Sequence, residues 1–302
     1  MSDGEIVVSH LAKQYRAVRA VDDLSFAVEP GRVTGFLGPN GAGKTTTLRM
    51  LLNLVTPSAG TATIGGQRYA DLTDPLRRVG AVLEASSAHR ARTGRNHLRA
   101  IGAAAGFPAR RADQVLELVG LTPAARRKFK GYSMGMRQRL GIAAAMLGDP
   151  GVLILDEPAN GLDPEGIRWM RDLLKRLADE GRTVLVSSHL LSEMQLLADD
   201  VLIIAKGKLV THGSVSDVVD GRAHAGPVRV RTPQAEQLTA ALGSAATVTT
   251  GEDGALLVSG VDAPAVGAAA LRAGVELHEL VAEKPDLERV FLDLTAGKAD
   301  IR

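Results

Sequence analysis

Between residue 6 and about residue 213, short apolar runs alternate with longer stretches in which apolar residues recur at helical spacing. The apolar runs have the length of strands and lie at residues 33–37, 152–155, 183–187 and 201–205. The helical patterns include residues 43–54 and 165–179. Strands that alternate with helices in this way favour a mostly parallel sheet. We therefore expect an α/β domain over residues 5–216.

One part of this region departs from the alternation. Residues 86–130 contain helix formers and apolar residues at helical spacing, as at residues 113–119, but no convincing strand. We expect a helical subdomain here, at about residues 86–145.

The composition changes after about residue 216, where glycines and a proline at residues 221–227 indicate a linker. The pattern then predicts a strand at residues 228–231 and a helix after Pro233. A hairpin of residues 247–250 and 255–258 follows, then a helix from Asp262 and a strand at residues 275–281. This βαββαβ order is ferredoxin-like. We expect a small C-terminal α+β domain over residues 226–302, with a last amphipathic helix at 286–294.

Composition adds several exclusions. The 302 residues, of which 45% are hydrophobic, suffice for one large and one smaller domain. The absence of cysteine excludes disulfides, cysteine-ligated metals and thiol catalysis. No apolar run approaches the roughly 18 residues that span a bilayer, and the N-terminus lacks the pattern of a signal peptide. We expect a cytosolic chain, or one held at a membrane by a partner.

The charge is unevenly distributed, although its formal net value is only +2. Residues 77–139 hold 14 Lys or Arg against 3 Asp or Glu, which leaves 22 against 31 in the rest of the chain. Such a basic block suits nucleic acid, an anionic membrane leaflet or an acidic partner. A solvated face of short helices accounts for it equally well.

A glycine-rich motif follows the first of the apolar runs. Residues 38–45 fit the pattern G-x-x-x-x-G-K-[ST] and comprise Gly38, Pro39, Asn40, Gly41, Ala42, Gly43, Lys44 and Thr45. Glycines let backbone N–H groups curl around phosphate oxygens, and the helix that follows directs its positive end at them. We expect Lys44 to neutralise the β and γ phosphates, Thr45 to ligate Mg²⁺ and Thr46 to bind the α phosphate.

Two carboxylates end a later apolar strand. Asp156 and Glu157 directly follow residues 152–155, at the sheet edge where open α/β sheets bind ligands. We expect Asp156 to hold the magnesium ion, usually through water. Glu157 is placed to polarise an attacking water, which requires a carboxylate within hydrogen-bond reach.

A third motif identifies a family. Residues 132–136, Tyr-Ser-Met-Gly-Met, resemble the L-S-G-G-Q signature of ATP-binding cassette (ABC) transporter ATPases, and residues 5 to about 215 resemble that cassette throughout. The resemblance implies a P-loop NTPase fold with a helical signature subdomain. It also implies that Ser133 and Gly135 reach the γ phosphate of ATP bound by the other subunit of a dimer.

The resemblance assigns three further residues. Tyr15 occupies the position that stacks on adenine, Asp163 that of the D-loop residue meeting the opposite subunit, and His189 that of the switch histidine contacting the γ phosphate and water. Two positions depart from the family. Glu84 replaces the Q-loop glutamine, leaving an oxygen ligand for Mg²⁺ or water, and Met134 replaces the first signature glycine.

Both departures, together with an L-E-x-V-F-L-x-L-T ending at residues 287–295, resemble bacitracin-type and other ABC-2 exporter ATPases. The resemblance implies an ATP-hydrolysing homodimer, with Mg²⁺, that drives a separate multispanning permease from the cytoplasmic side of the membrane. Export of a drug, antibiotic or peptide is the expected activity, without direct contact to nucleic acid. Two alternatives stay open, a soluble ABC ATPase acting on ribosomes or nucleic acid and a nucleotide-binding resistance or regulatory protein.

Overall fold

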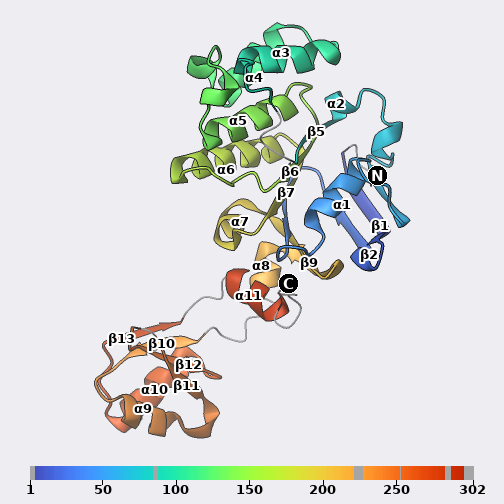
Figure 1. Cartoon of the computed structure of the whole chain (residues 1–302). Coiled ribbons are helices and arrows are strands. Elements are labelled where there is room, and N and C mark those ends of the chain that lie inside the picture. The colour runs from blue at the N-terminus through green and yellow to red at the C-terminus, as the bar shows by residue number, and fades with distance from the viewer. Residues whose placement is uncertain (1–3, 84–87, 221–226, 252, 283–286, 296–302) are drawn as a thin grey trace. The chain divides into compact units, whose positions relative to one another are not determined.

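The computed structural model describes residues 4–83, 88–220, 227–251, 253–282 and 287–295 (Figure 1). The chain divides into two compact units, the first ending at Val215 and the second covering Ser216–Leu292, and the described residues from 293 to 295 belong with the first. This division differs from the domain expected from the sequence, which includes all of residues 226–302. Among the described residues, no helix combines the length and apolar character needed to cross a bilayer.

A six-stranded sheet forms the centre of the first unit, in the order β5-β6-β7-β3-β8-β9. Its strands are β3 (Val33–Leu37), β5 (Val79–Val82), β6 (Val152–Asp156), β7 (Thr183–Ser188), β8 (Asp200–Ala205) and β9 (Lys208–Ser214). All neighbouring strands pair in parallel except β8 and β9. Every residue of β3, β6 and β7 is buried, as expected for strands covered on both faces. The predicted parallel α/β sheet is confirmed.

A second, antiparallel sheet lies in the same unit, in the order β2-β1-β4. It consists of β1 (Ile6–Tyr15), β2 (Val18–Val28) and β4 (Ala59–Ile64). One hydrophobic core joins the two sheets around α1 (Lys44–Leu51), with Leu48 and Leu51 of that helix packed among residues of both. This sheet is not evident from the pattern of the sequence. Its pairing shifts register where β1 and β2 bulge near His10 and Asp23, both at positive φ, so regular alternation is lost.

Helices supply the rest of the first unit. The helical segment consists of α3 (Gly94–Ala104), α4 (Arg110–Leu118), α5 (Met134–Ala145) and the 3₁₀ turns η2 (Thr122–Ala124) and η3 (Phe129–Gly131). The remaining elements are η1 (Tyr69–Asp71), α2 (Pro75–Arg78), α6 (Pro164–Asp179) and α7 (Leu191–Leu197). No strand occurs in the described residues between β5 and β6, and α3, α4 and α5 gather at one end of this unit (Figure 1).

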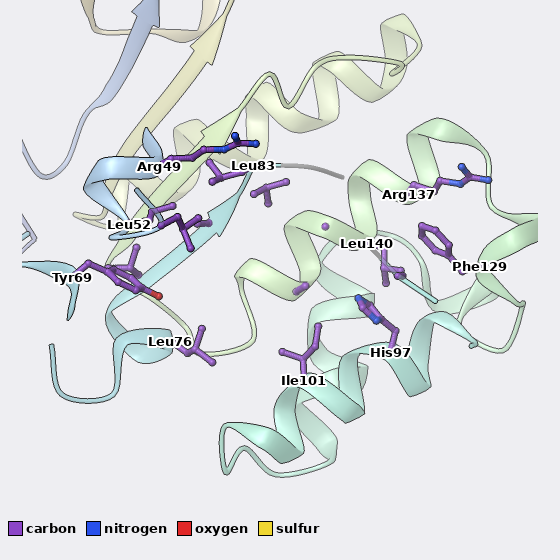
Figure 2. Close-up of a pocket in the computed structure, with 17 residues that line it drawn as sticks. Arg49, Leu52, Tyr69, Leu76, Leu83, His97, Ile101, Phe129, Arg137 and Leu140 are labelled. Carbon is purple, nitrogen blue, oxygen red and sulfur yellow. The ribbon is translucent and has the colours of Figure 1, made fainter. Parts of the chain in front are cut away.

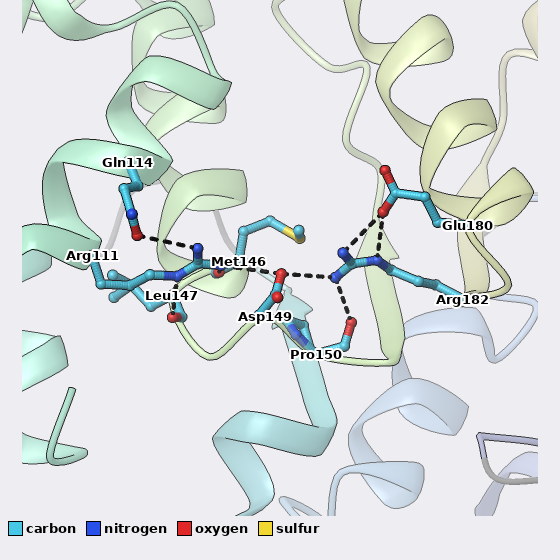
Figure 3. Close-up of polar contacts among 8 residues, drawn as sticks. All are labelled: Arg111, Gln114, Met146, Leu147, Asp149, Pro150, Glu180 and Arg182. Atoms are coloured by element: carbon cyan, nitrogen blue, oxygen red, sulfur yellow. Dashed lines mark hydrogen bonds and ion pairs between the residues drawn. The ribbon is translucent and has the colours of Figure 1, made fainter. Parts of the chain in front are cut away.

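The C-terminal end of α5 is bound by arginines from two directions (Figure 3). The Arg111 guanidinium of α4 donates to the carbonyl oxygens of Leu147 and Met146, at 2.9 and 3.0 Å. Asp149 Oδ1 accepts from both Arg111 and Arg182, at 3.1 Å each. Because Arg182 precedes β7 and also donates to Pro150 O at 3.0 Å, this network ties α5 to the sheet. Nearer the start of α5, the Arg139 guanidinium lies 4.2 Å from the centre of the Trp169 ring on α6.

The second unit contains a four-stranded antiparallel sheet in the order β11-β12-β10-β13. Its elements are β10 (Val228–Arg231), α9 (Ala235–Leu242), η4 (Gly243–Ala245), β11 (Thr247–Thr250), β12 (Leu256–Ser259), α10 (Ala263–Ala273) and β13 (Glu279–Ala282). Val228, Val230 and Val258 face α9 and α10 in its core. Helix α8 (Val215–Asp220) begins at the last residue of the first unit's main segment, and α11 (Leu287–Thr295) has residues assigned to both units.

The last strand starts later than predicted. Residues 275–278 were expected to be extended, but Gly274 adopts φ 66° and Val275 donates its N–H to Ala270 O at 2.9 Å. This bond, which runs back into the last turn of α10, belongs to a helix C-cap of the Schellman type. The backbone of Val275 therefore belongs to the cap of α10 and not to β13, and its side chain is buried.

Candidate nucleotide-binding site

The glycine-rich loop between β3 and α1 is crowded by neighbouring backbone at two of its glycines. A Cβ on Gly43, which has φ 107°, would lie 2.5 Å from Ala20 O, and one on Gly38 would lie 2.6 Å from Ile204 O. No other residue type fits either position without movement of the backbone. The loop borders a cavity of about 230 Å³, lined by Ala20, residues 39–46 and Glu157.

The Lys44 ammonium group lies inside this loop. Its side chain is only 7% exposed, its Nζ donates to Gly38 O at 2.6 Å, and Glu157 Oε1 lies 3.9 Å away. Burial lowers the pKa of Lys44 below its ordinary value, while the charges of Glu157 and Asp156 oppose that shift. An anion that enters the cavity would raise the pKa of Lys44 again and favour its charged form.

Asp156 is held from two neighbouring elements. Thr45 Oγ1 donates to Asp156 Oδ2 at 2.7 Å, and Ser187 Oγ donates to Asp156 Oδ1. The arrangement brings a hydroxyl and a carboxylate oxygen together beside the loop. Mg²⁺ takes hard oxygen ligands and commonly only one or two from protein, so Thr45 and Asp156 fit this ion. Ser187 was missed in the sequence analysis, although its position opposite Asp156 in the β6–β7 register places it there.

Glu157 is the acidic residue that lines the cavity. Its Oε2 lies 2.7 Å from His189 Nδ1, so the structure brings both predicted residues together. Glu157 adopts φ 49°, and its N–H contacts Ser187 O at 3.2 Å and Ser187 Oγ at 3.0 Å. A left-handed conformation in a non-glycine residue costs about 1–3 kcal/mol and is found mainly at functional sites.

Tyr15 lies at the end of β1, paired with Val18 across the turn that leads into β2. Its side chain is 46% exposed, and Lys13 Nζ lies 5.0 Å from the ring centre. Strand β2 carries Ala20, which lines the cavity. Ala20 is not among the site residues predicted from the sequence. Tyr15 is thus an exposed aromatic residue on a hairpin that reaches the loop, and such a ring can stack on a planar group.

The signature residues and Asp163 occupy helix starts. Ser133 caps α5 by accepting from Met136 N at 3.2 Å, and Asp163 caps α6 by accepting from Gly166 N at 2.8 Å. The beginnings of the two helices touch, because a Cβ on Gly161 would lie 2.2 Å from Met134 Cγ.

Ser133, Gly135 and Asp163 do not line the cavity of their own chain. Glu84, predicted to face the metal, lies outside the described residues. The loop, Asp156, Glu157 and His189 therefore form one cluster, and the signature residues stand apart from it.

Comparison with known proteins agrees with this geometry. Residues 21–160 match the family described as ABC transporter, and residues 226–288 match a domain of unknown function, DUF8746. The bacitracin transport ATP-binding protein BcrA of Bacillus licheniformis is 45% identical over 208 residues, 68% of each chain. The daunorubicin/doxorubicin resistance ATP-binding protein DrrA of Streptomyces peucetius is 37% identical over 314 residues, 98% of this chain and 94% of the relative.

A solved structure shows the same fold. The dimeric ATP-binding cassette MJ0796, in a post-hydrolysis state bound to ADP and phosphate, has a TM-score of 0.62 and 22% identity and covers 69% of this chain and 98% of its own. Together with the loop and the paired carboxylates, these likenesses establish that the chain belongs to the ATP-binding subunits of ABC transporters and is an ATPase.

Proposed function

We propose that the loop of residues 38–46 binds the phosphates of ATP, with Lys44 neutralising the β and γ phosphates and Thr46 reaching the α phosphate. Tyr15 stacks on the adenine ring. Thr45 and Asp156 hold Mg²⁺, with Glu84 as a further oxygen ligand, and the ion supplies neutralisation of phosphate charge when bound. The proposal is supported by the Thr45–Asp156 contact of 2.7 Å beside the loop.

Glu157 and His189 act on the attacking water in this proposal. The Glu157 carboxylate accepts a hydrogen bond from the water and polarises it toward the γ phosphorus. His189 acts chiefly as a hydrogen-bond donor, to the γ phosphate and the water. The observation that carries the assignment is the position of Glu157 on the cavity wall, 3.9 Å from Lys44 Nζ and 2.7 Å from His189.

The active form is a homodimer in which each ATP is enclosed by the loop of one subunit and by Ser133 and Gly135 of the other. Ser133 is exposed and its oxygen already accepts an N–H as a helix cap, so its hydroxyl proton remains free to donate to a phosphate. Asp163 meets the opposite subunit in the same interface. The dimeric state of the MJ0796 cassette supports this arrangement.

A permease docks in a groove between the sheet and the helical segment. The groove encloses about 480 Å³ and is mainly apolar, with Leu76, Ile101, Phe129 and Leu140 among its walls (Figure 2). A membrane protein's cytoplasmic loop that buries apolar side chains fits such a groove. The chain then works at the cytoplasmic face of the membrane. The names of the bacitracin and daunorubicin/doxorubicin relatives favour export of an antibiotic or drug.

Replacement of the Glu157 carboxylate by an amide tests the catalytic assignment. Glu157→Gln keeps the backbone bonds to Ser187 and removes the carboxylate charge, so ATP hydrolysis is expected to fall by about 10²–10⁴-fold. ATP binding should persist and ATP-dependent dimers should accumulate in size-exclusion chromatography. Glu117→Gln, an exposed change of the same charge on α4, is the matched control.

Wild-type turnover in Glu157→Gln would refute the assignment of Glu157. Recovery of the full chain with a multispanning membrane protein would support transport. Recovery instead with ribosomes or nucleic acid, in a salt-sensitive manner, would favour a soluble ABC ATPase.

A further inference from the structure

Two segments that are distant in sequence run side by side at the edge of the helical segment. Phe129 N donates to Arg92 O at 2.9 Å, and Lys130 N donates to Arg90 O at 3.0 Å. Thr93 and Lys128 form an antiparallel bridge between the same segments. The backbone bonds therefore fix residues 90–94 against residues 125–130.

This pairing brings together two segments that carry exposed cations, and we call these cations the basic rim. It consists of Arg90, Arg92, Arg126, Arg127, Lys128 and Lys130. Among the described residues, no carboxylate forms an ion pair with any of them, and the nearby Asp113 is bound by Arg95 and Arg99. Within the part of the chain that the structure describes, the rim is therefore a concentration of positive charge.

The positive field of the rim reaches a neighbouring histidine. The pKa of His97 lies below its ordinary value because of burial and, in addition, because of the charge of Arg92. His97 also lines the apolar groove, as does Phe129, which lies between the rim residues Lys128 and Lys130 in the chain. The rim thus borders the groove, and under the proposed function it lies on the side that faces the membrane.

From this geometry we propose that the basic rim binds the anionic headgroups of a phospholipid surface. Each Lys or Arg close to an anionic leaflet is attracted to it, and several together hold a protein at the surface. Single-stranded nucleic acid fits less well, because it is bound through stacked aromatic side chains. The aromatic rings of the described residues 88–130, Phe107 and Phe129, are both buried and covered by arginines. The rim would hold the chain at the membrane without the permease.

The proposal is tested by sedimentation of the full chain with vesicles of phosphatidylcholine, with and without phosphatidylglycerol. Wild-type protein is expected to bind only the anionic vesicles, and less as salt rises. Arg126→Gln with Lys128→Gln should weaken that binding by about thirty-fold, or roughly five-fold for each cation removed. The control pair, Arg168→Gln with Lys175→Gln, removes the same charge from exposed positions on α6 and should retain most of the binding.

Equal losses in the two double variants would overturn the proposal, as would equal binding to neutral vesicles. Rim-dependent binding of DNA, without binding of vesicles, would assign the surface to nucleic acid instead. ATP hydrolysis is measured in solution on every variant and is expected to stay at the wild-type rate, which also shows that the proteins are folded. Loss of lipid binding therefore leaves the proposed ATPase site standing, and loss of hydrolysis in Glu157→Gln leaves the rim untouched.

Discussion

Replacement of Arg111 by alanine should destabilise the first unit more than any neighbouring surface change. The side chain is 25% exposed and donates to the carbonyl oxygens of Leu147 and Met146, which follow the last turn of α5. Hydrogen bonds from a charged donor contribute about 1.5–3 kcal/mol each. Asp149, the third partner, has a side chain that is 60% exposed and adds at most about 1 kcal/mol.

Water partly replaces the lost donor at such a site, so we expect a loss of about 3 kcal/mol in the free energy of unfolding. For a unit of this size, that corresponds to about 6–12 °C in the midpoint of thermal unfolding. Circular dichroism of Arg111→Ala measures the shift, and Arg110→Ala, at an adjacent exposed arginine, is the control. The reasoning fails if both variants melt at the same temperature. A second expectation is that ATP hydrolysis falls while nucleotide binding is kept, because α5 carries Ser133 at its other end.

Further predictions concern the nucleotide site and the contact between Gly161 and Met134. The lowered pKa of Lys44 means that ATP binding takes up a proton once pH exceeds that pKa, so affinity should fall with rising pH and calorimetry in two buffers should detect the proton. The same shift makes folding more favourable as pH rises through the lowered pKa, since the unfolded lysine holds its proton more tightly. Tyr15→Phe should keep the affinity for a fluorescent ATP analogue and Tyr15→Ala should lower it about three- to ten-fold, and equal losses would exclude stacking. Gly161→Ala should lower the free energy of unfolding by about 1–2 kcal/mol because of the φ of 76°, and by more because the new methyl group meets Met134. Adding Met134→Ala to this variant should restore about 1 kcal/mol, measured by chemical denaturation. Additive effects of the two changes would contradict the contact.

Much of the fold and site follows from local patterns in the sequence. The strands that end at Leu37 and Asp156 are continuous apolar runs because both faces of the sheet are covered. The loop motif is recognisable because Gly38 and Gly43 have no room for a side chain. Where burial or backbone crowding limits a position to one kind of residue, the sequence alone predicts the structure.

Other features depend on how distant segments meet, and no local pattern reveals them. The contact of Ser187 with Asp156 follows from the register of two strands separated by a helix. Helical spacing predicts α4, but it does not predict that Arg111 of this helix binds the carbonyl groups at the end of α5. The ferredoxin-like assignment of the C-terminal domain, its boundaries and the roles of the site residues stay predictions.

The stacking of Arg139 on Trp169 has a practical consequence. Trp169 is the only tryptophan of the chain, and the cation above its ring belongs to the helix that begins at the signature motif. Indole emission responds to a nearby charge, so any displacement of α5 against α6 changes the fluorescence of unlabelled protein. The chain therefore carries its own optical probe, and rapid mixing with ATP could time the movement of the signature helix within a single turnover.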